Sequence, residues 1–271
     1  MEMSRYIFWC LPLVLLACGE EKIDRPLKAT VPDVLVVEGV LTNKKANHLI
    51  KLSRPSQELN GEGAPVSGAV VSIMEGNGKT YLATEAPAMP GHYFTESMTA
   101  VFGKPYTLSI QYNGKEYFAM AASVPVEPMG GLQYEKAGDG LYQLQFEESG
   151  SSPNYVDYHV SWANTPGCLP GSLCEGRLVY YDLKTVDVNS LFKPDKEDFL
   201  FPVGAVVVRT KYSVSPEYKS FLRSVLSETE WRGGLFDVPR ENVPTNLSEG
   251  AIGFFAVSTV LSDSTVIVEK P

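Results

Sequence analysis

Short apolar runs separated by turn residues fill the chain from Val34 to Ala121 and restrict what it can fold into. They lie at 34–40, 48–52, 69–74, 79–84, 92–95, 106–112 and 116–121, with no helical period in the segment. Asn77-Gly78 and Asn113-Gly114 each separate two runs, and Asn-Gly favours the positive φ angles of a tight hairpin turn. The segment therefore predicts an antiparallel β-sandwich.

The predicted sandwich has relatives in known modules. The segments 65–69, 91–93 and 103–108 resemble transthyretin-like and carboxypeptidase-regulatory-like sandwiches, which belong with the immunoglobulin-like folds. Such a module is usually a spacer or a docking unit, and a fold alone does not give a function. The stretch Val124-Pro125-Val126-Glu127-Pro128, followed by two glycines, indicates a domain boundary. We expect a sandwich domain at 33–126 and a β-rich domain at 127–271.

Strands continue in the second domain, at 141–146, 155–162, 177–183 and 203–212. In the second of these, alternation places Val156, Tyr158 and Val160 on one face and His159 on the other, so His159 is predicted to be a solvated strand residue. One helix is expected at 216–228. Ser215 can cap it, Pro216 suits its first position, and an apolar stripe predicts that it lies on a sheet, with residues such as Ser224 in water.

Four cysteines divide into two groups. Cys10 and Cys18 belong to the amino-terminal segment, which leaves Cys168 and Cys174 as a pair around a Pro-Gly turn. An exported chain reaches an oxidising compartment, where such a pair should close as a structural disulfide. A redox role would favour a Cys-x-x-Cys at the start of a helix, which this is not.

The amino terminus predicts export and lipid anchoring. Arg5 precedes an apolar run at 6–16 that is about half the roughly 20 residues of a membrane-spanning helix, so 1–17 is predicted to be a signal peptide. Cys18 follows Leu15-Leu16-Ala17, the pattern of a lipoprotein cleavage site, although Ala17 alone could direct ordinary signal cleavage. A bacterial lipoprotein cysteine carries several acyl chains, which hold a protein durably.

The charged and polar stretch 18–32 is expected to be a tether. Its acidic residues resemble the export signal of some Bacteroidota lipoproteins, although a plain spacer would have the same composition. The chain has a formal net charge of -9, which argues against nucleic acid as a partner. His48, His92 and His159 share no metal-ligand spacing, and no cofactor is expected. An acidic loop with Asp187, Asp195, Glu197 and Asp198 is expected to be solvated rather than to bind a cation.

No catalytic residues are predicted. The chain lacks the Gly-x-Ser-x-Gly elbow, the His-Glu-x-x-His helix and the phosphate-binding Gly-rich loop. The neighbours Glu147 and Glu148 would face opposite ways on a strand end, whereas glycoside hydrolysis needs two carboxyl groups across a cleft. An unrecognised hydrolase stays open as a minor alternative.

Several segments together resemble a known family. They are Val36–Thr42, Pro65–Ala69, Ser215-Pro216 with Tyr218, Gly233 to Pro239, Asn242 to Leu247 and Gly253-Phe254-Phe255-Ala256-Val257-Ser258. The pattern is similar to that of Bacteroidota outer-membrane lipoproteins known as domain of unknown function 4249. Genes of that family typically lie beside TonB-dependent receptors, so the resemblance implies an accessory role in uptake at the outer membrane. It implies no catalytic residues.

These patterns lead to one functional expectation. The protein is expected to be anchored in the outer membrane through Cys18, with a TonB-dependent receptor as its partner and a ligand that the sequence does not identify. Loops carry function more often than scaffolds, so we place the working surface at 233–250 and at Trp231, Arg232 and Phe236. Core closure is the competing interpretation of Trp231. A structural or adhesive cell-surface protein is the main functional alternative.

Overall fold

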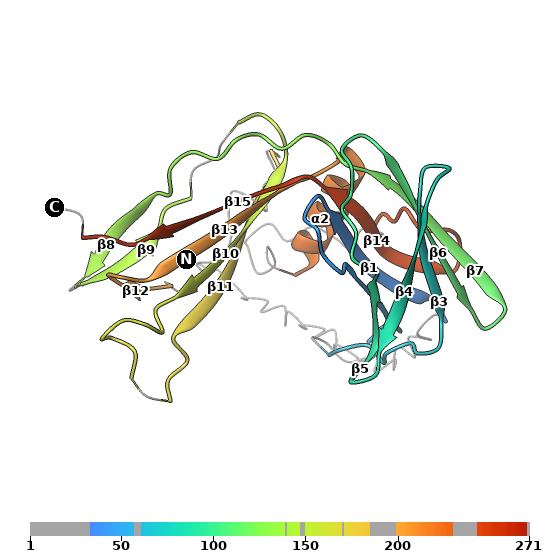
Figure 1. Ribbon diagram of the computed structural model, residues 1–271, viewed down its shortest axis with the longest axis horizontal. Helices are drawn as coiled ribbons and strands as arrows, with labels where there is room; N and C mark the ends of the chain where they lie inside the picture. The colour runs from blue at the N-terminus through green and yellow to red at the C-terminus, as the bar shows by residue number, and fades with distance from the viewer. Residues whose placement is uncertain are drawn as a thin grey trace, which may run out of the picture. The chain divides into compact units, whose positions relative to one another are not determined.

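The computed structural model describes residues 33–56, 61–138, 140–146, 150–169, 171–184, 199–229 and 243–269. Residues Pro32–Pro271 form one compact unit. Over these ranges the fold is mainly β with one helix, as predicted (Figure 1). Within the described ranges, no helix is both long and apolar enough to cross a membrane.

Eight strands form the first sheet, in the order β14-β1-β2-β5-β4-β3-β6-β7. Alternating side chains point into one core, as in β1, where Leu35, Val37 and Leu41 are fully buried. All neighbours are antiparallel except β1 and β14, which run parallel and were not predicted to pair. The strands are β1 Leu35–Thr42, β2 Leu49–Ser53, β3 Val70–Glu75, β4 Thr80–Ala86, β5 Met89–Thr95, β6 Pro105–Tyr112, β7 Lys115–Ala122 and β14 Ala251–Ser258.

The two predicted hairpins form, but their turns differ. Asn113 and Gly114 have φ angles of 49° and 72°, as an Asn-Gly turn between β6 and β7 requires. Between β3 and β4 the positive φ of 55° lies at Gly76, so the prediction that Asn77-Gly78 supplies the left-handed residues was wrong. Gly76 directly precedes Asn77, and a glycine adopts a positive φ at less steric cost than an asparagine.

A second group of strands packs in two layers around a separate core. One layer has the order β11-β10-β13-β15 and the other β12-β9-β8. Tyr142 and Phe201 from the smaller sheet are fully buried in one cluster with Val160 and Val207 from the larger one. The strands are β8 Tyr134–Gly138, β9 Leu141–Leu144, β10 Asn154–Ser161, β11 Glu175–Asp182, β12 Phe201–Pro202, β13 Val206–Ser213 and β15 Val260–Val266.

The helix α2 spans Pro216–Glu228, the predicted range. Its residues Tyr218, Leu222 and Leu226 are buried in one cluster with Phe254 and Ala256, so the helix covers the outer face of β14. The prediction that it lies on a sheet is thus confirmed. Ser224, expected in water, is buried instead, because the covered face of the helix is wider than the apolar stripe that predicted it.

The last two strands connect the two groups. Only Thr259 separates β14, in the first sheet, from β15, in the second group (Figure 1). Gly253 permits the close parallel pairing of β14 with β1, because an added Cβ would lie 2.1 Å from the carbonyl oxygen of Val37. The predicted second domain, 127–271, therefore contributes one strand to the sheet of the first.

Candidate functional site: a groove beside helix α2

An open groove lies where helix α2 meets the margin of the first sheet. Its volume is about 460 Å³, which is within the range of roughly 300–1,000 Å³ typical of ligand pockets. Phe254 of β14 and Asn246 line it, with Met120 and Ala122 of β7 and the start of α2. Most of these groups are apolar, and Glu217 is the charged residue among them.

Asn246 holds together the two margins of the sheet below the groove. Its side-chain amide donates to the carbonyl oxygens of Met120 on β7 and Phe255 on β14, at 3.1 and 2.7 Å. Its oxygen accepts the Phe255 N–H at 3.1 Å. Leu247 adds a bridge to Ala119 of β7. One asparagine thereby replaces part of the backbone ladder between two strands that do not pair directly, and the sheet curls around its core.

The start of helix α2 forms the wall of the groove. The Ser215 hydroxyl accepts the Tyr218 N–H at 3.2 Å, and Pro216 occupies the first turn, where a missing N–H costs nothing. The Tyr218 ring stacks on Phe254 with 5.1 Å between centroids. The helix is therefore fixed to the residue that forms the apolar base of the groove.

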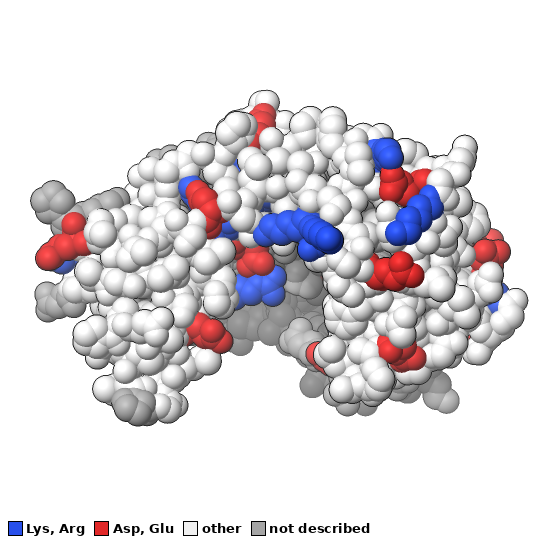
Figure 2. All heavy atoms as spheres, in the orientation of Figure 1, with Lys and Arg blue, Asp and Glu red and all other residues white. Residues whose placement is uncertain are grey.

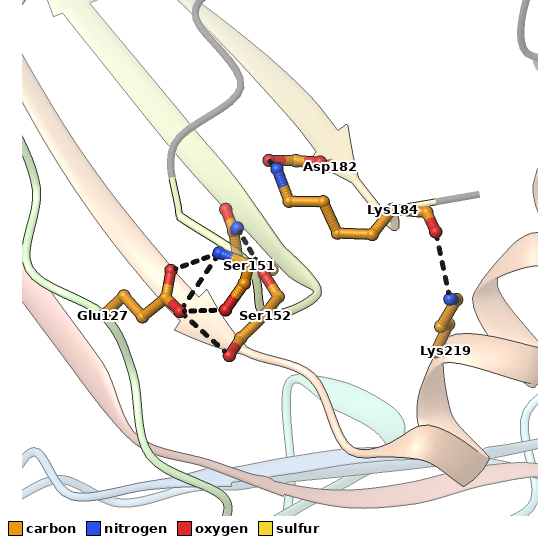
Figure 3. A network of polar contacts seen from close by, with 7 residues as sticks. Glu127, Ser151, Ser152, Asp182, Lys184 and Lys219 are labelled. Atoms are coloured by element: carbon orange, nitrogen blue, oxygen red, sulfur yellow. Dashed lines mark hydrogen bonds and ion pairs between the residues drawn. The ribbon is translucent and has the colours of Figure 1, made fainter. Parts of the chain in front are cut away.

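A polar network ties the same helix to the second group of strands (Figure 3). Lys219 of α2 donates to the carbonyl oxygen of Lys184 at 3.4 Å. Lys184 has a φ of 50°, and its Nζ lies 2.6 Å from the buried Asp182 Oδ2. This contact is an ion pair, but it does not meet the geometry of a hydrogen bond. The strained Lys184 thus connects the end of β11 to the helix.

A smaller polar cavity lies nearby, beside β13. Lys211 and Arg209 line it and are 1% and 8% exposed. Arg209 forms a two-pronged ion pair with Asp263, with both N–O distances at 2.6 Å. Burial lowers the pKa of Lys211, an effect that the charges of Glu127 and Asp182 oppose. With a volume of about 70 Å³ the cavity is far smaller than a nutrient site.

Glu127, in the segment before β8, bonds to the residues just before β10. Its carboxylate accepts the Ser151 N–H and hydroxyl at 3.0 Å and the Ser152 hydroxyl at 3.1 Å (Figure 3). These bonds, led by that from the Ser151 N–H, lower the pKa of Glu127. The network stabilises the junction that was predicted to be a domain boundary.

Several predicted residues can be placed. Cys168 and Cys174 are joined in a disulfide. His159 is exposed and lies 3.6 Å from Glu175, as expected for a solvated strand residue. His48 is buried. Within the described ranges, no three His, Cys, Asp or Glu side chains gather in a way that could hold a metal ion.

The remaining site predictions lie outside the described residues. They are Cys18 with the signal peptide and tether, the ligand-site residues Trp231, Arg232 and Phe236, the acidic loop with Asp187, Asp195, Glu197 and Asp198, and the pair Glu147 and Glu148. Of the working surface predicted at 233–250, the structure describes 243–250, which supplies Asn246 to the groove. Met120 and Ala122 were not predicted, because nothing in their strand pattern marks a groove formed by distant segments.

Comparison with known families gives a match along most of the chain. The family described as "Domain of unknown function (DUF4249)" matches residues 20–264. The chain belongs to this family. A comparison with curated proteins finds no match. The DUF4249 match begins two residues after Cys18, so the family domain follows directly on the predicted lipidation site.

Three of the segments that carried the family resemblance meet at the groove. Ser215 and Pro216 come from the first, Asn246 from the second and Phe254 from the third. The first and last of these residues, Ser215 and Phe254, are 39 positions apart in the sequence. Their convergence makes the groove the strongest candidate site in the described part of this DUF4249 protein.

Proposed function

We propose that this protein is an outer-membrane lipoprotein that acts as a non-catalytic partner of a TonB-dependent nutrient transporter. In this proposal Cys18 carries the lipid, and the groove beside α2 contacts the receptor or its ligand. The transporter itself comes from what the family resemblance implies about neighbouring genes.

The convergence of three family segments on one groove is the observation that carries the proposal. The groove combines an apolar base with a few polar groups at its margin, the composition usual for binding sites. Met120 is 63% exposed at its edge, so a partner that covered it would bury a large apolar side chain. Such burial contributes roughly 1.5–3 kcal/mol.

Affinity purification from outer membranes solubilised in mild detergent tests the proposal. The tagged wild-type protein should recover a TonB-dependent receptor, with crosslinking in living cells if the contact is weak. Met120→Arg should reduce the recovery at least tenfold, because it places a charge at the edge of an apolar groove.

Leu82→Arg is the matched control. Leu82 is 55% exposed on β4 of the same sheet and does not line the groove, so this variant should recover the receptor as the wild type does. If no receptor co-purifies with the wild-type protein, even after crosslinking, the transporter proposal fails and a structural or adhesive surface protein becomes the better hypothesis.

A further inference from the structure

The loop between β10 and β11, residues 162–174, has two solvent-exposed leucines. Leu169 is 67% exposed and Leu173 is 80% exposed. The disulfide between Cys168 and Cys174 encloses both of them. The loop extends beyond the ends of its two strands, at the lower left of Figure 1. Exposed leucines on a closed, projecting loop differ from the scattered apolar residues of an ordinary surface.

The loop backbone is internally bonded. Trp162 N–H donates to the Cys174 carbonyl oxygen at 2.8 Å, and Thr165 N–H donates back to Trp162 at 3.0 Å. Further turns join Cys168 to Thr165 and Ser172 to Leu169, both at 3.0 Å. A loop with these groups already paired loses fewer hydrogen bonds with water when it enters an apolar phase.

The loop also carries no charge. Residues 162–174 include no Asp, Glu, Lys or Arg, in a chain with a net charge of -9. In Figure 2 the visible surface of this projection is free of charged side chains. The cost of moving an ionised group out of water is therefore absent at the tip.

We propose that this loop is a second membrane contact, in which Leu169 and Leu173 enter the interfacial region of a lipid bilayer. The inference rests on the proposed lipid anchoring of the protein. Two leucines with most of their surface in water supply a weak, reversible attachment. Such an attachment suits a chain that a lipid already holds beside the membrane, where it sets the orientation of the domain.

The composition of the loop favours a bilayer over a protein partner. Hot spots of protein interfaces are enriched in Trp, Tyr and Arg, and leucine is under-represented among them. Between Cys168 and Cys174 the large side chains are the two leucines. Distance also permits the contact, because the chain between Cys18 and Asp33 can span up to about 50 Å.

Vesicle binding by residues 19–271 tests the inference, since this chain keeps the whole compact unit Pro32–Pro271. The probe is a vesicle of phosphatidylcholine, and the readout is the partition coefficient from flotation. We expect the wild-type chain to bind and Leu169→Ser/Leu173→Ser to lower the coefficient at least tenfold. Phosphatidylglycerol in the vesicles should weaken binding, because the acidic chain is repelled by anionic lipid. Equal partition of the wild type and the double variant, or no wild-type binding, would overturn the inference.

Val70→Ser/Leu82→Ser is the matched control, because it removes two apolar side chains that are 59% and 55% exposed on the first sheet. It should bind vesicles as the wild type does. The vesicles contain neither receptor nor acylated cysteine, so failure here leaves the transporter proposal untouched. If the double leucine variant binds vesicles normally but no longer recovers the receptor, the loop is a protein contact and the membrane inference is wrong.

Discussion

At the scale of single residues, Asn246 joins the two margins of the first sheet. Its amide makes three hydrogen bonds to two strands that have no direct ladder between them. Two of these bonds involve Phe255, which is fully buried in the core of the first sheet. The side chain thus connects the closure of the sheet to the groove above it.

Asn246→Ala should lower the free energy of unfolding by about 2–4 kcal/mol, since each lost bond contributes about 1 kcal/mol and backbone groups are left without partners. Chemical denaturation measures the change. Asn164→Ala removes the same amide from an exposed loop position and should stay within about 0.5 kcal/mol of the wild type. Equal effects of the two substitutions would show that Asn246 does not hold the sheet closed.

We expect His48 to make the stability of the protein depend on pH. Its ring is 6% exposed, and its Nε2 has no hydrogen-bond partner among the described residues. Burial lowers its pKa, partly offset by a hydrogen bond with the Met98 backbone. The folded protein therefore binds this proton less readily than the unfolded chain. The stability from the neutral ring is complete above pH of about 6.5 and is lost as the pH falls toward the lower folded-state pKa.

The free energy of unfolding should accordingly fall more between pH 7.5 and pH 5 in the wild type than in His48→Gln. Denaturation at both pH values measures the difference. His92→Gln, at a histidine that is not buried, controls for the loss of an imidazole and should follow the wild type. A pH dependence unchanged by His48→Gln would place the acid sensitivity elsewhere.

What the sequence predicted at this scale depended on local geometry. Asn113-Gly114 and the solvated His159 follow from a two-residue turn and from strand alternation, which are properties of neighbouring residues. The closure by Asn246 and the contact of Gly253 with Val37 join positions that are distant in the sequence. A periodic pattern of apolar residues carries no information about contacts between distant positions, so the groove could not be predicted from the sequence.

At the scale of elements, helix α2 connects the groove to the rest of the fold. Its buried stripe packs on Phe254 and Ala256 of β14, and its first turn forms the wall of the groove. The helix was predicted because a cap, a proline and a 3.6-residue period coincide. The strands β8 and β12 were missed. β12 has two residues, too few for alternation to show, and in β8 one buried residue is followed by four exposed ones, so no alternation exists there.

Leu222→Ala should destabilise the protein by about 2–5 kcal/mol, because Leu222 is 7% exposed in that packed cluster. It should also reduce the recovery of the receptor, since the helix positions the groove wall. Ser220→Ala, at an exposed position of the same helix, should change stability by no more than about 0.5 kcal/mol. A small loss for Leu222→Ala, equal to that of Ser220→Ala, would mean that α2 is not held by this packing.

At the scale of the whole molecule, the groove and the loop at 162–174 belong to different parts of the fold. The groove uses β7, β14 and α2, whereas the loop joins β10 and β11. A protein tethered by a lipid and oriented by a loop would present the groove in a restricted direction. In this proposed arrangement the lipid on Cys18 is the anchor, and the loop sets only the orientation.

Cys18→Ala should therefore abolish metabolic labelling with a fatty acid and move the protein from the membrane fraction to the soluble fraction. The loop at 162–174 should not retain it, because two leucines bind a bilayer only weakly. Leu169→Ser/Leu173→Ser with Cys18 intact should stay in the membrane fraction and should become more accessible to protease, since the domain is no longer held against the bilayer. Membrane retention of Cys18→Ala would refute the lipid anchor, and its release only after the leucines are also replaced would make the loop the stronger attachment.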